Sequence, residues 1–199
     1  MIVYREAVDT EAKEIAEVHY KTFKNFFLTS LGNSFLKTYY KSCIKFDEAI
    51  AICAVDENNN IVGFSVGSLN SKGFHKRLIF NNCIPFFIQT IIILVSKPKA
   101  LFRLFKNFNK EVNLTDDGNY AELLSIGVLI EKKGLGIGKG LLVAFEKIVQ
   151  SKNIKRISLT TDFKNNDSVL KFYKSLGYEV YYDFIAYPKR KMFRLIKKI

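Results

Sequence analysis

The sequence is poor in the residues that build disulfide frameworks and metal sites. Among its 199 residues are three cysteines and two histidines. The cysteines are widely spaced, form no CxxC pair and make no metal-ligand pattern with the histidines. We therefore expect reduced thiols, no metal site and a cytoplasmic protein.

Long apolar runs are also lacking. The longest extends from Ile84 to Val95, whereas a helix that spans a bilayer needs about 20 such residues. The first residues, MIVYREAVDTEAKE, lack the basic segment and apolar core of a signal peptide. There is no internal repeat and no obvious linker, and 48% of the residues are hydrophobic, enough for a sizeable core. We therefore predict one domain, residues 1–199, without a transmembrane helix.

Acidic residues are few compared with basic ones, 19 against 31, so that the formal net charge is +12. A basic surface attracts polyanions such as nucleic acid, anionic lipid or a phosphorylated cofactor. An ordinary lysine-rich, solvated surface explains the same charge. The charge alone does not choose among these alternatives.

The pattern of apolar residues predicts alternating strands and helices. Strands are predicted over 1–5, 49–55, 61–69, 120–130, 156–161, 178–187 and 191–196. The strand over 120–130 is apolar enough to be buried on both faces. Helices are predicted from Asp9 or Thr10 to about Phe23, over 34–46 with Ser34 as its cap, and from a glycine-rich loop to about Lys152. A last, short helix is predicted to start near Asn166 or Asp167 and to end just before Gly177.

The glycine-rich loop, KKGLGIGKGLL, lies between a predicted strand and a predicted helix. Unpaired N–H groups and the helix dipole make a helix N-terminus attractive to anions, and glycines let a phosphate approach the backbone. Lys133 and Lys139 add positive charge beside the glycines. The dinucleotide fingerprint GxGxxG and the P-loop pattern GxxxxGK[ST] both fail here. The loop alone thus leaves two readings, a phosphate cradle and a plain turn.

Two motifs in the right order decide between these readings. The stretch from Lys133 to Gly138 resembles the Q/R-x-x-G-x-G/A signature of the GCN5-related N-acetyltransferases, the GNAT superfamily, with lysine at its first position. Downstream, NNDSVLKFYKSLGY is similar to the family segment N-x-x-A-x-x-x-Y-x-x-x-G-[FY]. Val169 replaces the usual alanine, and the other positions match: Asn166, Tyr173, Gly177 and Tyr178. One helix and one strand separate the two motifs, as in the family.

The resemblance implies the GNAT fold, an α/β (α+β) architecture with a central mixed, mostly antiparallel, twisted sheet flanked by helices. It implies acetyl-CoA as the acetyl donor, with its pantetheine arm inserted between a parted fourth and fifth strand. Asn166 would touch this arm or the phosphates, although capping of a helix explains an asparagine there equally well. The residues that the resemblance assigns to the cofactor are Ile126, Gly127, Val128, Lys133, Gly134, Leu135, Gly136, Ile137, Gly138, Lys139 and Asn166.

Two residues are candidates for proton transfer. Tyr173 matches the family tyrosine that protonates the departing thiolate, and a phenol is neutral at pH 7. The alternative for Tyr173 is a core aromatic on the inner face of its helix. Glu122 lies on the strand before the loop, where some relatives carry a catalytic glutamate, and a carboxylate that faces an apolar cleft can act as a base through water. The alternative for Glu122 is a surface charge at a strand end.

The segment from about 70 to 119 is a predicted helical insertion between the third and fourth strands. Two helices are expected in it, split by Pro85 and by Lys97-Pro98. Packing of these helices on the sheet is favoured over a role in specificity, a dimer face or contact with a membrane. The basic residues of the insertion are Lys72, Lys76, Arg77, Lys97, Lys99, Arg103, Lys106 and Lys110.

The predicted function is transfer of an acetyl group from acetyl-CoA to a primary amine of a small-molecule acceptor. We expect a monomer or homodimer that has no nucleic-acid partner, because no nucleic-acid module is recognised. Two alternatives stay open: a non-catalytic acyl-CoA-binding protein, and a basic nucleic-acid-binding protein with lysines and stacking aromatics.

Overall fold

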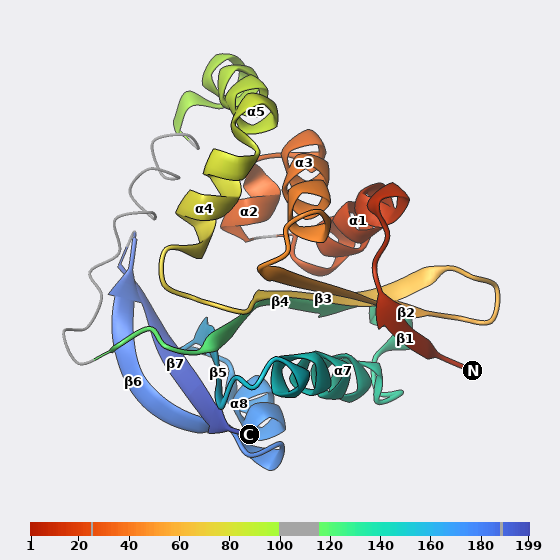
Figure 1. The fold of residues 1–199 in the computed structure, drawn as a ribbon, viewed down its shortest axis with the longest axis vertical. Helices are drawn as coiled ribbons and strands as arrows, with labels where there is room; N and C mark the ends of the chain where they lie inside the picture. The colour runs from red at the N-terminus through yellow and green to blue at the C-terminus, as the bar shows by residue number, and fades with distance from the viewer. Residues whose placement is uncertain (25, 100–115, 188) are drawn as a thin grey trace.

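One sheet of seven strands organises the molecule. The computed structural model describes residues 1–24, 26–99, 116–187 and 189–199. The strand order is β1-β2-β3-β4-β5-β7-β6, and neighbours are antiparallel except for the parallel pair β4 and β5 (Figure 1). This mixed, mostly antiparallel sheet confirms the predicted fold class. The strands are β1 Val3–Glu6, β2 Ala49–Val55, β3 Ile61–Ser68, β4 Ala121–Val128, β5 Arg156–Asp162, β6 Glu179–Ala186 and β7 Arg190–Lys198.

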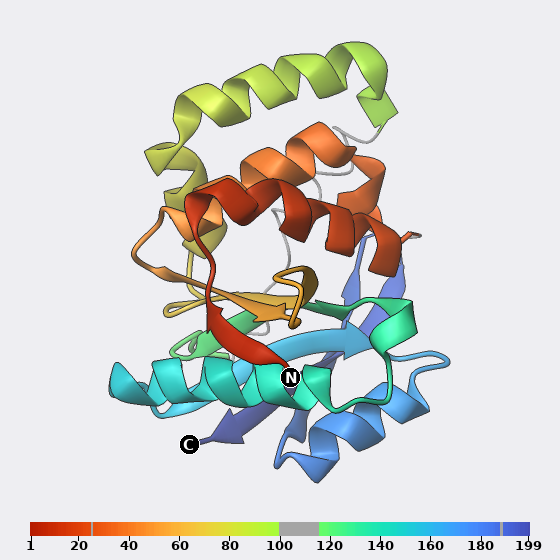
Figure 2. The ribbon, with the colours of Figure 1, turned by 90° about the vertical axis from the view of Figure 1, so that its right-hand side faces the viewer.

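Helices cover both faces of the sheet. In Figures 1 and 2, α1 and α3 lie on one face, α7 and α8 lie on the other, and α5 lies beyond α3, away from the sheet. Short 3-10 turns, Asp9–Glu11 and Ile130–Lys132, precede α1 and α7. The helices are α1 Ala12–Thr22, α2 Phe27–Ser30, α3 Asn33–Ile44, α4 Phe74–Asn81, α5 Cys83–Ser96, α7 Ile137–Ser151 and α8 Asp167–Ser175.

A hydrophobic core lies on each face because successive strand residues point to opposite sides. In β2, Ala51 and Cys53 belong to the core beneath α1 and α3. Their neighbours Ile50 and Ile52 belong to the core beneath α7. Both β2 and β3 are therefore almost continuously buried.

Details of the first helices differ from the prediction. Gly32, not Ser34, occupies the N-cap of α3, and the Ser34 hydroxyl instead accepts a hydrogen bond from Gln89 Nε2 at 3.0 Å. The prediction of Ser34 as a cap was therefore wrong. The four-residue helix α2 was not predicted, because it is too short to show a period of apolar residues.

The insertion contains α4 and α5, but its break is not at Pro85. The chain bends by 98° between α4 and α5, at Asn82. Pro85 lies in the first turn of α5, where its missing N–H has no helical acceptor to lose. α5 packs mainly on α3, which differs from the predicted packing on the sheet, whereas Phe74 and Leu78 of α4 belong to the core beneath α1 and α3. Most of the second predicted helix, from Pro98 onward, lies outside the described residues.

No single described helix is both long enough and apolar enough to cross a bilayer. The bent pair formed by α4 and α5 meets a test of length and composition when both are counted together.

Candidate active site

A cleft opens where β4 and β5 part. The two strands pair only through Ala121–Leu123 and Ile157–Leu159, although both continue for several residues. The register of β4 against β3 shifts just after Leu123, leaving Leu124 as an extra residue. A β-bulge of this kind bends its strand. The bend carries β4 away from β5 and leaves their ends without a common ladder.

The cleft has a volume of about 460 Å³. Its walls are the parted ends of β4 and β5, together with α8, the segment from α1 to α2, and the start of β7. The prediction that the 120–130 strand is buried on both faces is therefore wrong in part, since Leu124 to Ile126 are only half-buried and line this cleft. Of the predicted site residues, the cleft brings together Ile126, Asn166 and Tyr173.

The register fixes the direction of the backbone groups of Val128. Val128 lies opposite Gly63, and the next residue, Leu129, donates its N–H to Val62 O at 2.9 Å. In an antiparallel ladder this identifies Val128 and Gly63 as a non-hydrogen-bonded pair. The N–H and C=O of Val128 therefore point away from β3, toward the side on which β5 has departed.

The glycine loop leads into the N-terminus of α7. Gly134 and Gly136 have positive φ values of 82° and 74°, and a Cβ on either would meet no atom within 4 Å. The first helical bond runs from Gly140 N to Gly136 O at 3.0 Å, so the preceding N–H groups have no acceptor within the helix. Lys133 and Lys139 are exposed on either side. The loop is thus open, cationic at its ends and rich in free backbone donors.

Other glycines of this region serve packing. A Cβ on Gly140 would overlap the ring of Tyr4, and one on Gly127 would lie 3.0 Å from a ring atom of Phe23. Ile137 turns its side chain into the core and is 1% exposed. These positions therefore hold the loop and β4 against their neighbours, and the open glycines are Gly134 and Gly136.

A family model described as "Acetyltransferase (GNAT) family" matches residues 13–178, most of the chain. The chain belongs to the GNAT family of acetyltransferases. It is accordingly an acyltransferase, and the predicted family and class of enzyme are confirmed. None of the curated proteins matches the sequence at a significant level.

Solved structures share the fold of this acetyltransferase at low sequence identity. A putative GNAT-family acetyltransferase from Desulfovibrio desulfuricans has a TM-score of 0.64 and 10% identity, with 100% of this chain and 99% of that chain covered. The ribosomal-protein-S18-alanine N-acetyltransferase from Escherichia coli has a TM-score of 0.63 and 11% identity, with 100% and 94% covered. The PaiA N-acetyltransferase from Thermoplasma acidophilum, solved with coenzyme A, has a TM-score of 0.55 and 15% identity, with 100% and 99% covered.

Tyr173 lies on α8 with its side chain in the cleft wall and only 6% of its surface exposed. Burial raises the pKa of its phenol to about 12, because the charged phenolate loses hydration there. The hydroxyl therefore keeps its proton at neutral pH and is a hydrogen-bond donor. No partner for this hydroxyl is seen within the described part of the chain.

Asn166 stands at the N-cap position of α8, but its side chain makes no cap hydrogen bond. Its amide nitrogen donates to Thr161 Oγ1 at 2.6 Å and to Asp162 O at 2.8 Å. Simple helix capping, the alternative considered for Asn166, is therefore not observed. The side chain instead fixes the start of α8 to the end of β5, inside the cleft.

Glu122 is not among the residues that line the cleft. It accepts hydrogen bonds from Arg194 Nη1 at 2.9 Å and from Ser71 Oγ at 2.5 Å. Arg194 also donates to Ser158 Oγ at 3.1 Å. Glu122 and Ser158 lie side by side in the short paired stretch of β4 and β5. Glu122 thus belongs to an ion pair across the closed end of the cleft, and the expected apolar surroundings are not found.

The remaining partners of Arg194 reinforce this closed end. Arg194 Nε lies 3.6 Å from Asp116 Oδ2, and Asp116 accepts hydrogen bonds from the hydroxyls of Tyr120 and Tyr182 at 2.7 and 2.5 Å. These bonds from the tyrosine hydroxyls help to lower the pKa of Asp116, against the opposing effect of its burial. The network ties β4, β6 and β7 together where the parting of the strands begins.

Sequence reasoning missed two polar groups of the cleft. His19 is 3% exposed, its Nδ1 lies 2.5 Å from Tyr40 Oη, and burial lowers its pKa to about 4. Asp162 pairs with Arg190, whose Nη2 lies 2.5 Å from Asp162 Oδ2. His19 falls on the apolar stripe of its helix, and Asp162 meets Arg190 only through strand pairing, so neither stands out in the sequence.

Proposed function

We propose that this acetyltransferase moves an acetyl group from acetyl-CoA directly to a primary amine of a small-molecule acceptor. The observation that carries the proposal is the parting of β4 and β5 beside an open, glycine-rich helix N-terminus. An extended thioester arm needs a gap in a sheet, and a diphosphate needs free N–H groups. Both lie in one continuous stretch of chain here, from Leu124 to Lys139.

The loop fits a diphosphate by its chemistry. The backbone from Lys133 to Lys139 would hold the phosphate oxygens, because Gly134 and Gly136 place no side chain in their way. The exposed ammonium groups of Lys133 and Lys139 add charge that glutamine would lack. The pantetheine arm would follow Ile126 to Val128, with Asn166 on the opposite side of the cleft.

Acetyl-CoA supplies an activated acetyl thioester. The chain's own groups then act on charge that develops during transfer. The N–H of Val128, directed away from β3, donates a hydrogen bond to the thioester carbonyl oxygen as it becomes negative. The hydroxyl of Tyr173 donates its proton, or a hydrogen bond, to the departing sulfur, since its raised pKa keeps it protonated.

The acceptor ammonium must lose one proton to become a nucleophile, and the nitrogen loses a second proton after it attacks the thioester carbon. Glu122 was the expected base, but its carboxylate is already engaged by Arg194 and Ser71. We therefore propose that water in the cleft accepts the first proton from the amine. Asp162 is the one carboxylate among the residues that line the cleft, where it is paired with Arg190, and the lining also includes the aromatic side chains of Phe23 and Phe26. An amine with a small apolar body suits this combination.

A thiol-release screen with acetyl-CoA and a panel of amines tests the proposal. The panel contains small amines, amino sugars, polyamines, aminoglycosides and peptides with free N-termini. We expect free thiol to be released with at least one small amine. We also expect calorimetry to show that the chain binds coenzyme A. Binding of coenzyme A without thiol release from any amine would make the chain an acyl-CoA-binding protein. Retention of RNA or DNA without coenzyme A binding would overturn the proposal altogether.

A further inference from the structure

Helix α5 presents an unusually apolar outer surface. Several of its large apolar side chains are exposed by about half or more. Isolated exposed apolar residues are ordinary, but a contiguous patch of this kind marks a binding surface. The exposed fractions are Ile84 70%, Phe87 66%, Ile88 51%, Ile91 47%, Ile92 45%, Leu94 55% and Val95 82%, with Phe80 of α4 at 83%.

The fold itself uses only a narrow stripe of α5. Phe86, Gln89 and Ile93 are the buried residues of this helix, and they recur at helical spacing toward α3. Figures 1 and 2 show α5 as the layer farthest from the sheet, so that its other face points out of the molecule. A helix that is apolar on nearly all sides is typically enclosed by protein or lipid.

The stretch of sequence that contains α5 carries charge of a single sign. The sequence contains no aspartate or glutamate from Asn58 to Lys110. Lys76 of α4, together with Lys97 and Lys99 beyond α5, are exposed. Arg77 is the basic residue that is already paired, with Glu48 Oε2 at 2.5 Å. The apolar surface is therefore bordered by exposed cations and by no anion of its own segment.

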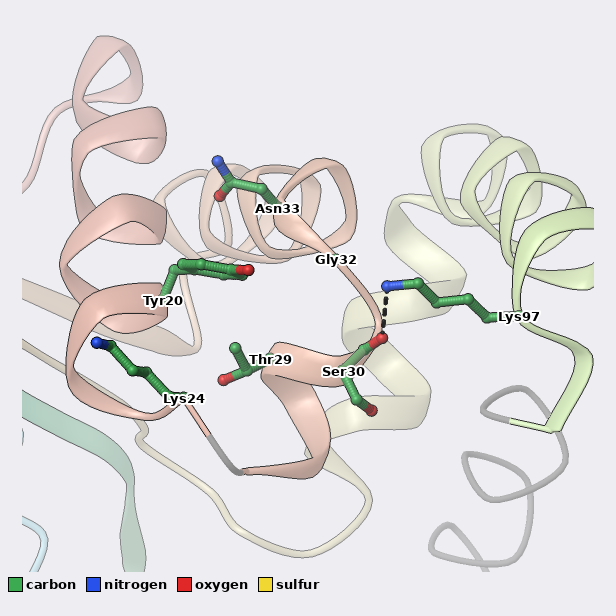
Figure 3. A pocket seen from close by; sticks show the side chains of 7 residues that line it. All are labelled: Tyr20, Lys24, Thr29, Ser30, Gly32, Asn33 and Lys97. Atoms are coloured by element: carbon green, nitrogen blue, oxygen red, sulfur yellow. Dashed lines mark hydrogen bonds between the residues drawn. The ribbon is translucent and has the colours of Figure 1, made fainter.

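A polar pocket of about 460 Å³ lies at the C-terminal end of α5 (Figure 3). Its lining carries two lysines, hydroxyls and an amide, but no carboxylate: Tyr20, Lys24, Thr29, Ser30, Gly32, Asn33 and Lys97. Lys97 Nζ donates to Ser30 O at 2.9 Å and so joins the end of α5 to α2. Residues of α2, Phe27 and Leu28, line the cleft on the other side.

We propose that α5 docks on the surface of an anionic phospholipid bilayer, with its apolar face among the acyl chains and the pocket of Figure 3 against the headgroups. Apolar area and attraction to anionic lipid together drive such docking. The helix is 14 residues long, or about 21 Å, and a bilayer core is about 30 Å thick. α5 therefore lies on the bilayer and does not cross it.

The charge distinguishes lipid from other occupants. A second copy would set the same basic border against itself across a two-fold axis, in a chain of net charge +12. Nucleic acid would leave the aliphatic side chains of α5 without a partner. In an anionic bilayer, the acyl chains can bury the apolar face of α5, and the headgroups can attract the lysines that border it. Docking would also bring the α2 side of the cleft close to the lipid surface.

Vesicle sedimentation of the full chain tests the proposal. The vesicles are phosphatidylcholine alone or mixed with phosphatidylglycerol, at low and at physiological salt. We expect binding to the mixed vesicles, weaker binding to phosphatidylcholine, and loss of affinity with salt. The double variant Phe87→Ser, Ile91→Ser should bind the mixed vesicles at least about tenfold more weakly. Because both side chains are exposed, the variant should keep its fold and its affinity for coenzyme A.

Two matched controls separate this surface from general effects. Ile185→Ser removes an apolar residue of 73% exposure on β6 and should leave vesicle binding unchanged. Lys97→Glu with Lys99→Glu should abolish the preference for phosphatidylglycerol, whereas Lys152→Glu with Lys155→Glu should not. No sedimentation at low salt, or equal binding of the Phe87 and Ile91 variant, would overturn the proposal. If the native chain forms a dimer in the absence of vesicles, and the Phe87 and Ile91 variant is a monomer, the membrane proposal is overturned in favour of a second copy on this surface.

Discussion

At the scale of single residues, Tyr173 carries the sharpest prediction. Tyr173→Phe removes the hydroxyl and keeps the ring, so we expect kcat to fall at least about tenfold, which corresponds to about 1.4 kcal/mol. The KM for acetyl-CoA should change little. Because the pKa of Tyr173 is about 12, no alkaline limb of the pH–rate profile below that value should come from this residue. Steady-state kinetics over a range of pH measure both effects.

Tyr178 is the matched control for Tyr173. It is also buried, but its hydroxyl donates to Glu146 Oε1 at 3.1 Å and it does not line the cleft. Tyr178→Phe should therefore lower the free energy of unfolding by about 1 kcal/mol and leave kcat unchanged. Equal losses of kcat in the two variants would point to packing, and an unchanged kcat in Tyr173→Phe would remove this tyrosine from the mechanism.

The variant Glu122→Gln tests whether Glu122 has a structural or a catalytic role. Glu122→Gln breaks the pair with Arg194, in which the two side chains are 15% and 12% exposed. Breaking a buried pair leaves an uncompensated charge, so we expect a loss of about 3 kcal/mol in unfolding free energy. The pH–rate profile should keep its midpoint, because water is the assigned proton acceptor.

Glu146→Gln provides the comparison for Glu122. Glu146 pairs with Lys197 at 2.8 Å, its side chain is 13% exposed, and it is not among the residues that line the cleft. Both variants should lose stability, measured by urea unfolding, without any shift in the profile. A shifted or missing acid limb in Glu122→Gln alone would restore Glu122 as the base.

His19 should make the stability of the fold depend on pH. Burial lowers its folded-state pKa from 6.5 to about 4, so the unfolded chain takes up a proton at a higher pH than the folded chain. Stability is then complete above pH 6.5 and is lost as the pH falls toward 4, by up to about 3 kcal/mol. His19→Gln should flatten this part of the curve. Urea unfolding at several pH values measures the difference between the variant and the native sequence, in which the carboxylate contributions cancel.

At the scale of elements, two glycine substitutions distinguish the effect of backbone strain from the effect of losing ligand contacts in the glycine loop. Gly136→Ala puts a Cβ on a residue with φ of 74°, at a cost of about 1 kcal/mol, and crowds the proposed phosphate cradle. We expect coenzyme A affinity to fall several-fold by calorimetry. Gly177→Ala imposes the same strain at φ of 86° beside Lys197, away from the loop. It should lose stability and keep its coenzyme A affinity; a similar loss of affinity in both would argue against the cradle.

The elements around the loop were predictable because their signals are local. The glycines and the amphipathic pattern after them lie in one stretch of sequence, and the family resemblance supplied the parting of β4 and β5. The bond between Glu122 and Arg194 joins residues 72 positions apart, so no local pattern reveals it. The direction of the Asn166 amide likewise depends on where β5 ends, and α2 is too short to show a period.

At the scale of the whole molecule, the surplus of positive charge attracts the ligand that the cleft is proposed to bind. A chain of net charge +12 attracts the phosphates of coenzyme A before any specific contact forms. The cleft then joins α1, α2, β4, β5 and α8, which carry residues from both ends of the sequence. A ligand bound there should stabilise the fold as a unit.

Comparison of coenzyme A with pantetheine tests this coupling. Coenzyme A at about 100 times its Kd should raise the free energy of unfolding by about 2.7 kcal/mol, seen as a higher Tm. Pantetheine keeps the arm and the thiol but lacks the diphosphate, so the same concentration should give a much smaller shift. The difference between the two ligands should shrink as salt is added, because screening weakens the phosphate contacts. Equal shifts from both ligands would mean that the backbone from Lys133 to Lys139 holds no diphosphate, and that the arm alone accounts for binding.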